Sequence, residues 1–174
     1  MNLRKLIPAH YDGLYFAEDD ALRATHYRGD TLRFSQDGRF LYATTRGMTP
    51  ATRGYVTVWQ VNPNGTLGDF GFQQPEAFVP VTRYQTPTFG GKANAVEAFP
   101  FHAGAWEAGG KEGEVAVSRD WIVLTDDGEG WVWVLEFDAE KGTVEEVAGV
   151  QLGRQEGATE EEQGTGASHA VWLS

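Results

Sequence analysis

Two arginines stand close together in the stretch TTRGMTPATRGYVTVW, which runs from Thr44 to Trp59. Arg46 and Arg53 lie in a loop punctuated by glycine and proline, between two runs of strand-like sequence. A planar guanidinium can hold a carboxylate through two hydrogen bonds, so arginines at the end of a strand predict an anion-binding site. The formal net charge of the chain is -11. Such a site must therefore depend on a local cluster of arginines and not on the field of the whole protein.

A structural role is the alternative for each arginine. Arg46 could pair with a nearby carboxylate and simply hold its loop in place. Arg53 lies further along the loop and matches no motif, so the structural role is preferred there.

Other kinds of chemistry lack the residues that they need. There are no cysteines, which excludes disulfides, thiolate metal sites and cysteine nucleophiles. His10, His26 and His102 are scattered without metal-ligand spacing. Asp126 and Asp127, with Glu129, do not form a calcium-loop pattern and are expected to serve a turn. With no phosphate loop or nucleophile elbow either, we expect no metal and no organic cofactor.

The composition also limits the partners. Acidic residues outnumber basic residues by 25 to 14, which argues against binding nucleic acid. The opening sequence MNLRKLIPAHYDG lacks the roughly 7–15 apolar residues of a signal peptide. No window approaches the ~18 apolar residues of a membrane span. We therefore expect a cytoplasmic protein that contacts neither membrane nor nucleic acid.

Strand patterns dominate the chain, and the only helical pattern is the short segment Glu18–Ala24. Turn signals at Gln36–Gly38 and Asn62–Gly65 separate some of the strands. The expected strands are Asp30–Ser35, Phe40–Thr45, Tyr55–Val61, Phe78–Thr82, Asn94–Phe99, Trp121–Thr125, Trp131–Asp138, Thr143–Leu152 and Ser168–Leu173.

The chain also repeats itself. RGDTLRFS, from Arg28, matches KANAVEAF, from Lys92, and ASHAVWLS, from Ala167. RFLYATTRG matches DWIVLTDDG, and GYVTVWQVNPNGTL matches GWVWVLEFDAEKGTV. Each unit reads as a four-stranded meander, and tandem units of this kind are typical of a β-propeller. The predicted fold class is all-β, a partial β-propeller of about two four-stranded blades plus extra strands.

The repeat divides the chain into segments. We expect a lead-in at 1–26 that holds a leftover strand, a blade at 27–90, a blade at 91–154 with a Gly-rich insertion at 102–117, an acidic loop at 155–166 and a lone closing strand at 167–174. Propellers close with roughly 4–8 blades, so two blades leave open edges. Open edges predict a complementary chain, self-association or aggregation.

The overlay gathers polar residues at one end of the units. Asp30, Asn94 and His169 share the start of the first strand in three units, and Arg46 and Asp127 share the end of the second strand. In a propeller this end lines the central channel. The candidates for one funnel are Arg28, Asp30, Arg46, Lys92, Asn94, Asp127 and His169. The alternative for the Asp and Asn residues is to accept backbone hydrogen bonds in turns, and only His169 would titrate near neutral pH.

Four segments carry a family resemblance: YRGDTLRFSQDGRFLYATTRG, TFGGKANAVEAFPF, WIVLTDDGEGWVWVLEFD and GASHAVWLS. They resemble the C-terminal part of the fungal 3-carboxy-cis,cis-muconate lactonizing enzymes. These belong to the lactonase family of seven-bladed propellers, which also includes 6-phosphogluconolactonases. The resemblance runs from about Arg23 to Ser174, with gaps at 102–117 and 155–166.

The resemblance implies a cycloisomerase that works on a carboxylated muconate without metal or organic cofactor. Arg46 occupies the place where the family has an arginine that points at the substrate carboxylates, which implies a catalytic role. Arg28, Asp30, Asn94, Asp127 and His169 remain substrate-binding candidates. The general acid/base residues of the family precede the matched part, so the chain is expected to be incomplete for activity alone, as a truncated product would be.

Three further interpretations stay open at this point. The chain could belong to a lactone hydrolase of the same family, which would need to activate water. It could be a propeller-type binding module without chemistry. It could also be a truncated product with no activity of its own.

Overall fold

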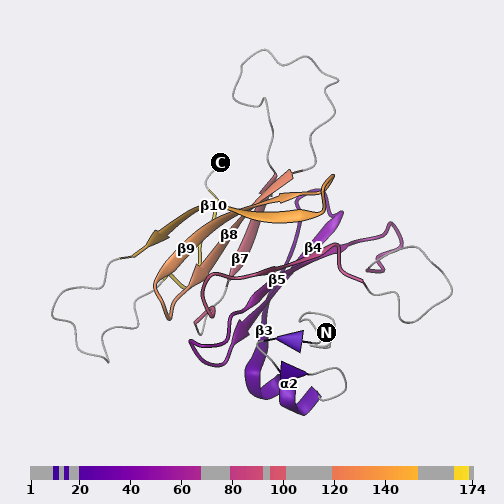
Figure 1. Ribbon diagram of the computed structural model, residues 1–174. Coiled ribbons are helices and arrows are strands. Elements are labelled where there is room, and N and C mark those ends of the chain that lie inside the picture. Colours follow the sequence, from indigo (N-terminus) through magenta and orange to yellow (C-terminus); the bar gives the residue numbers. More distant parts are fainter. Residues whose placement is uncertain are drawn as a thin grey trace.

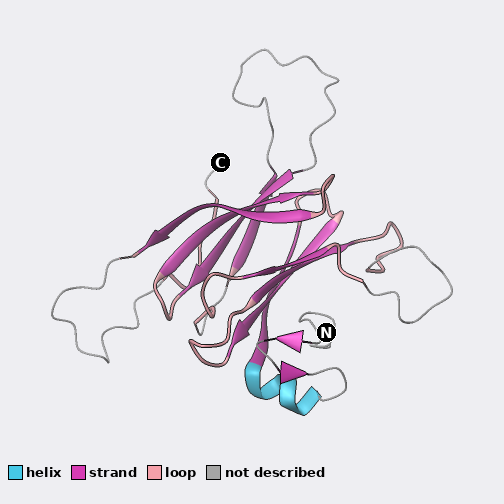
Figure 2. Cartoon of the chain, viewed as in Figure 1, coloured by secondary structure: helices cyan, strands magenta, loops and turns pink. Residues whose placement is uncertain are grey.

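The computed structural model describes residues 10–11, 14–15, 20–67, 79–91, 95–100, 119–152 and 167–172. Nearly all regular structure in these residues is β-strand (Figure 2). A short hairpin pairs β1 (His10–Tyr11) with β2 (Leu14–Tyr15), and helix α2 (Asp20–His26) follows. No helix in the described part of the chain is long and apolar enough to cross a membrane.

Two four-stranded antiparallel sheets form the body of the molecule (Figure 1). The first contains β3 (Tyr27–Phe34), β4 (Phe40–Gly47), β5 (Tyr55–Gln60) and β6 (Thr82–Gln85). The second contains β7 (Val96–Pro100), β8 (Arg119–Asp126), β9 (Trp131–Asp138) and β10 (Thr143–Gln151). In both sheets each strand pairs with the next one in the sequence. The all-β prediction is confirmed, and the two meanders are consistent with a partial propeller.

The sheets pack face to face through an apolar core. Phe40, Tyr42, Val56 and Val58 project from the first sheet, and side chains including Ile122, Leu124, Leu135 and Phe137 project from the second. The rings of Phe40 and Phe137 meet edge to face with centroids 4.9 Å apart. Such pairs add about 0.5–1.5 kcal/mol to the free energy gained by burial alone. Strand β3 lies near β7 and β6 lies near β10, so the sheets are stacked in the same order.

Hydrogen bonds show that the two sheets are structural repeats. The amide of Thr31 donates to Oγ1 of Thr44 over 2.9 Å, where a bulge interrupts the pairing of β3 with β4. At the matching place in the second sheet, the amide of Ala95 donates to Oγ1 of Thr125 over 3.3 Å. The sequence overlay aligns Thr31 with Ala95 and Thr44 with Thr125, so the repeat is present in the contacts themselves.

The described elements differ from the predicted ones in several places, of which three matter most. The predicted strand Phe78–Thr82 is wrong, because the fourth strand is Thr82–Gln85, where it pairs with Tyr55 to Val58 at the start of β5. The helix begins and ends two residues later than predicted. Residues 167–172 do not form the predicted strand Ser168–Leu173. They contact the second sheet through side chains instead, since no described strand pairs with them.

The C-terminal segment nevertheless has a defined place. The indole Nε1 of Trp172 donates to the carbonyl of Glu97 over 3.4 Å, and its ring lies against Phe99 and Trp121. The Gly-rich insertion at 102–117 and the acidic loop at 155–166 lie outside the described residues, as do Lys92 and Asn94.

Candidate functional site

Arg46 and Arg28 lie opposite each other at one end of the first sheet. They are register partners on β4 and β3, so their Cβ atoms share one face at about 4.5–5.5 Å. Arg28 is exposed, whereas the side chain of Arg46 is only 14% exposed. Like charges placed directly opposite each other are destabilising unless an anion lies nearby. This arrangement is therefore a candidate anion site.

Asp30 supplies one such negative charge. Its Oδ2 lies 3.5 Å from Nε of Arg46, and its side chain is 24% exposed. The structural alternative for Arg46, pairing with a nearby carboxylate, is thus also realised. Arg46 therefore already has one carboxylate partner within the protein.

The tripeptide Phe89–Gly91 holds Arg46 from the other side. Nη1 of Arg46 donates to the carbonyl of Gly91 over 2.7 Å. The amide of the next residue, Gly47, donates to the carbonyl of Phe89 over 2.8 Å. These two bonds attach the end of β4 to the segment that leads from the first sheet to the second.

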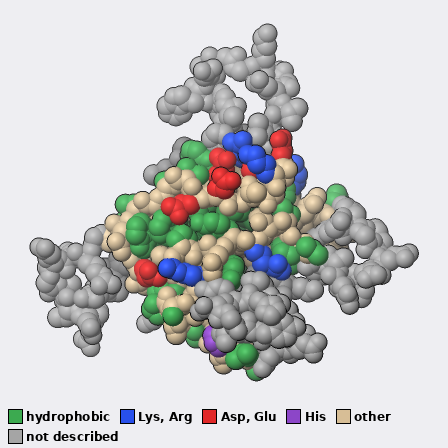
Figure 3. All heavy atoms as spheres, viewed as in Figure 1, with side chains coloured by type: hydrophobic (Ala, Val, Ile, Leu, Met, Phe, Trp, Pro, Cys, Tyr) green, Lys and Arg blue, Asp and Glu red, His purple; other side chains and the backbone are tan. Residues whose placement is uncertain are grey.

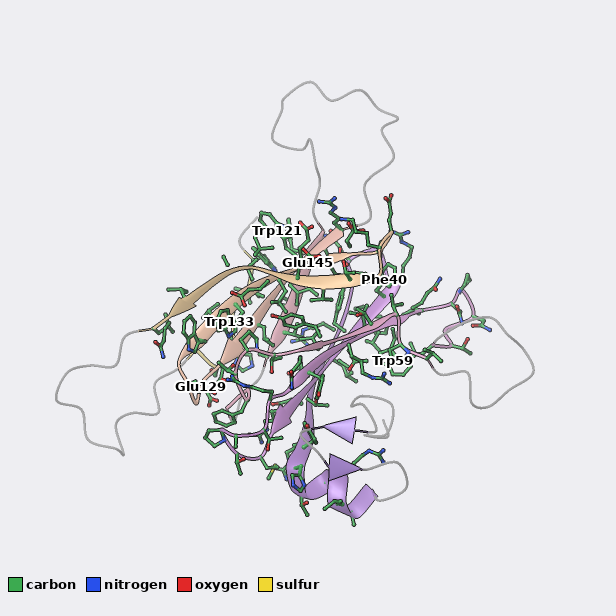
Figure 4. The ribbon with its side chains drawn as sticks, viewed as in Figure 1. Phe40, Trp59, Trp121, Glu129, Trp133 and Glu145 are labelled. Atoms are coloured by element: carbon green, nitrogen blue, oxygen red, sulfur yellow. The ribbon has the colours of Figure 1, made fainter. Side chains whose placement is uncertain are left out.

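The turn between β8 and β9 holds the opposite side of this tripeptide. Oδ2 of Asp126 accepts from the amide of Gly90 over 2.9 Å, and Oε1 of Glu129 accepts from the amide of Phe89 over 3.1 Å. Figure 4 shows Glu129 at the opposite end of the sheets from Phe40 and Trp121. The end of β4, the connecting tripeptide and the β8–β9 turn therefore meet at one end of the molecule.

Asp127 reaches the same place. A Cβ built on Gly91 would lie 2.1 Å from Oδ1 of Asp127, so this carboxylate packs directly against the glycine backbone. Gly91 also has a φ of +62°, which side-chain-bearing residues rarely adopt. The structure thus places Arg28, Asp30, Arg46 and Asp127 around one end of the two sheets.

His169 is exposed, and its Nδ1 lies 3.2 Å from Oγ of Ser168. The carbonyl of Ser168 accepts from Oγ1 of Thr125, at the end of β8. This contact puts His169 at the same end of the second sheet as Asp126 and Asp127. Asn94, a further candidate, lies outside the described residues.

Gly91, Asp126 and Glu129 are the parts of the site that sequence reasoning missed. Asp126 and Glu129 were assigned to turn chemistry, and both do serve the connection between the sheets. The doublet Gly90–Gly91 was the available signal, because both residues have positive φ values, +98° and +62°. Among the described residues, no group of three or more His, Asp or Glu side chains is placed to hold a metal ion.

No protein-family model matches the chain. Comparison with curated proteins finds two relatives. "Muconate cycloisomerase 1" of Cutaneotrichosporon cutaneum is 34% identical over 116 residues, which are 67% of this chain and 26% of the relative. "Carboxy-cis,cis-muconate cyclase" of Neurospora crassa is 25% identical over 114 residues, which are 66% of this chain and 24% of the relative.

The chain spans about a quarter of the length of the curated relatives that it matches. Both relatives bear the names of enzymes that act on muconates. These matches confirm the resemblance to the muconate lactonizing enzymes drawn from the sequence: over about two thirds of its length, the chain is a homologue of carboxy-cis,cis-muconate cyclase and of muconate cycloisomerase 1.

Proposed function

We propose that this chain forms the carboxylate-binding part of an enzyme that closes or opens a lactone ring on a muconate-type substrate. The single observation that carries the proposal is the placement of Arg46. Its guanidinium is fixed by Asp30 and by the carbonyl of Gly91, with Arg28 opposite it on the neighbouring strand. The names of the two relatives support the substrate class.

The chemistry needs a fixed cation. To close the ring, a carboxylate oxygen of the substrate adds to a carbon of a conjugated double bond. The C–O bond forms, the π bond breaks, and its electron pair moves towards a second carboxylate. A proton from a general acid then adds to the neighbouring carbon, and ring opening is the reverse. Arg46 binds the second carboxylate and stabilises the charge that develops there.

The donors of Arg46 suit this role. A guanidinium has five N–H donors in a planar fork. Nη1 donates one of its two hydrogens to the carbonyl of Gly91, and Nε lies 3.5 Å from Oδ2 of Asp30, so hydrogens on Nη1 and Nη2 remain for a substrate carboxylate. Because both anchors belong to the protein, the orientation of the guanidinium is set before substrate binds. Removing one such preorganised donor typically raises the barrier by about 2.7–4 kcal/mol.

Calorimetric titration of the 174-residue chain with 3-carboxy-cis,cis-muconate tests the site. We expect Arg46→Ala to weaken binding about tenfold or more, since hydrogen bonds to charged groups contribute about 1.5–3 kcal/mol. Arg28→Ala should weaken it less. Arg39→Ala is the matched control, because Arg39 is an exposed arginine that pairs with Asp37 beyond the other end of β4. Equal affinity for the wild type and Arg46→Ala would refute the assignment.

A lactone hydrolase would use the same anion site but would consume water. Assaying a gluconolactone beside the muconate in the complete enzyme separates the two reactions. Turnover of the gluconolactone alone would replace the cyclase proposal with the hydrolase.

We also propose that a further β-sheet packs against the second sheet. The face of the first sheet that carries Phe40, Tyr42, Val56 and Val58 is covered by the second sheet. The repeat aligns these residues with Trp121, Val123, Val132 and Val134. Strand alternation turns those four side chains away from the first sheet.

Trp172 already occupies part of that outer face. The repeat aligns Arg33, Glu97 and Trp172. Nε of Arg33 bonds to Oε2 of Glu97 over 3.0 Å, and Trp172 donates to the carbonyl of Glu97 over 3.4 Å. The terminal segment thus lies on the second sheet as β7 lies on the first, which supports a third sheet at this position. In Figure 3, hydrophobic side chains lie across the middle of the side of the molecule that faces the viewer, with acidic side chains beside them.

The isolated chain should associate through this face. Val150, 55% exposed, is the register partner of Val132 and shares the face. In sedimentation experiments, Val150→Lys should reduce concentration-dependent association. Val79→Lys should not reduce the association, because Val79 is 66% exposed but lies away from this face. Equal association of both variants would show that this face is not the contact.

A further inference from the structure

A chain of hydrogen bonds connects the end of β4, in the first sheet, to the end of β8, in the second sheet. Asp126, at the end of β8, bonds to the amide of Gly90, and the carbonyl of the next residue, Gly91, accepts from Arg46. We infer that Asp126 is a positioning residue for Arg46, so that the second sheet sets the geometry of the anion site on the first. This inference rests on the proposed function for its ligand but not for its geometry.

Asp126 is built to hold backbone amides. It is 1% exposed. Its Oδ1 accepts from the amides of Gly128 and Glu129 over 2.8 and 2.9 Å, while Oδ2 accepts from Gly90 over 2.9 Å. All three partners are donors, so the ionised carboxylate, which only accepts, fits them. An asparagine would turn an NH₂ group towards at least one of these amides.

Without the bond to Asp126, the backbone at Gly90 and Gly91 could adopt many conformations. Gly90 and Gly91 both lie in the left-handed region, with φ of +98° and +62°. Glycine reaches such conformations easily but also leaves them easily, because no Cβ restricts the backbone. The direction of the Gly91 carbonyl therefore depends on hydrogen bonds to other parts of the protein. The bond from the Gly90 amide to Asp126 is such a bond, because Gly90 directly precedes Gly91.

The orientation of the Arg46 guanidinium depends on the direction of the Gly91 carbonyl. Its Nη1 lies 2.7 Å from the Gly91 oxygen, whereas its Nε lies 3.5 Å from Asp30. The shorter contact determines the plane of the guanidinium, and the plane decides whether a carboxylate can be held by two bonds. Releasing Gly90 should leave the charge of Arg46 unchanged and loosen its orientation.

The chain offers a matched control for a purely structural role. Asp138 is 5% exposed and caps the β9–β10 turn as Asp126 caps the β8–β9 turn. Its Oδ1 accepts from the amides of Glu140 and Lys141 over 3.0 and 3.1 Å. Asp138→Asn therefore makes the same substitution in a turn at the other end of the sheet, away from the tripeptide Phe89–Gly91.

The first experiment follows the guanidinium by ¹H–¹⁵N spectroscopy on the intact chain without ligand. A hydrogen-bonded Nη1 should rotate and exchange slowly in the wild type and in Asp138→Asn. Asp126→Asn should bring the Arg46 signals to fast rotation. Arg46 signals that are unchanged in Asp126→Asn would overturn the inference, whatever the chain binds.

The second experiment measures the affinity for 3-carboxy-cis,cis-muconate in a double-mutant cycle. Asp126→Asn should weaken binding about tenfold in the wild type and have no further effect in Arg46→Ala. An equal loss in both backgrounds would show a structural role and overturn the inference. If the wild type binds no carboxylate, the proposed function fails, and the spectroscopic experiment alone decides the positioning role.

A second variant covers the case in which Asp126→Asn does not fold. Asp126→Ser keeps one oxygen to accept from the turn amides. A single short side chain cannot also reach Gly90, so this variant should still release Arg46. Slow Arg46 signals in a folded Asp126→Ser chain would equally overturn the inference.

Discussion

The guanidinium of Arg46 donates a 2.7 Å hydrogen bond to the carbonyl oxygen of Gly91, 45 residues further along the chain. The bond joins the residue before the last of β4, in the first sheet, to the segment that leads into the second sheet. Gly91 is in a left-handed conformation and has the Asp127 carboxylate against it. The position therefore accepts only glycine. Both the stability of the chain and the orientation of the Arg46 guanidinium depend on this glycine.

Gly91→Ala should destabilise the chain strongly. The added Cβ would lie 2.1 Å from Asp127 Oδ1 and 2.4 Å from the amide of Gly128. We expect a loss of about 3 kcal/mol in the free energy of unfolding, measured with urea. Gly65→Ala is the control, because Gly65 has φ of +81° with nothing within 4 Å of its Cβ position. The control should lose only about 1–2 kcal/mol, and equal losses would show that the Gly91 site has room.

Tyr42→Phe should weaken the interface between the sheets. The buried hydroxyl of Tyr42, on β4, donates to Oδ2 of Asp120, on β8. Losing that donor should cost about 1–3 kcal/mol of unfolding free energy. Tyr84→Phe, at a half-buried residue of β6, should cost less. Chemical denaturation measures both, and a neutral Tyr42→Phe would mean that this contact contributes nothing to stability.

The same tyrosine should make the fold sensitive to alkali. Burial raises the pKa of Tyr42, and the charge of Asp120 and the hydrogen bond to it raise this pKa further. An unfolded tyrosine titrates near pH 10, so the stabilisation is complete below that pH and is lost as the pH rises above it. Ultraviolet titration should include a tyrosine, Tyr42, that ionises only when the chain unfolds. Tyr42→Phe should remove it, and an unchanged titration would contradict the prediction.

Acid should remove a different contribution. Hydrogen bonds from the side chain and amide of Lys141 hold the pKa of Asp138 below its ordinary value. Partial burial acts to raise the pKa of Asp37, but bonds from the Arg39 amide, Ser35 and the Arg39 side chain lower it overall. Both contributions are complete above about pH 4 and are lost as the pH falls through the lowered pKa values.

Unfolding measured across this acid range should show the loss directly. The double variant Asp37→Asn/Asp138→Asn should have a flatter dependence on pH than the wild type. An identical dependence would show that other carboxylates control the acid transition.

Phe137→Ala should open a cavity between the sheets. Phe137 is 1% exposed and contacts the rings of both Phe40 and Tyr42. We expect a loss of about 3–5 kcal/mol in unfolding free energy. Phe34→Ala removes the same side chain where it is 59% exposed, and should change stability by less than about 0.5 kcal/mol. Similar losses for the two variants would contradict the packing described for the core.

Local patterns in the sequence were enough to predict most of the fold. The alternation in Tyr55–Gln60 and Trp131–Asp138 predicts strands because successive side chains point to opposite faces. The overlay pairs Thr31 with Ala95 and Thr44 with Thr125, and the structure then gives these pairs equivalent hydrogen bonds. Arg46 was found for the same reason, since a charged residue at the end of an apolar strand is visible without any tertiary information.

Other features depended on contacts between distant residues. The fourth strand of the first sheet lies at Thr82–Gln85 because its pairing with β5 determines the register, and the apolar run before it did not reveal this. Residues 167–172 look like a strand in sequence, but a strand requires a hydrogen-bonded neighbour, and no described strand supplies one.

The amino-acid sequence by itself therefore determined the strand content, the repeat and the position of Arg46 at the end of a strand. Only the tertiary structure decided that Asp126 holds Gly90, that Gly91 holds Arg46, and that Tyr42 bonds to Asp120. The physical reason is that periodicity and turn preference act over a few residues along the chain. A hydrogen bond between two sheets depends on how their faces pack, which no short stretch of sequence specifies.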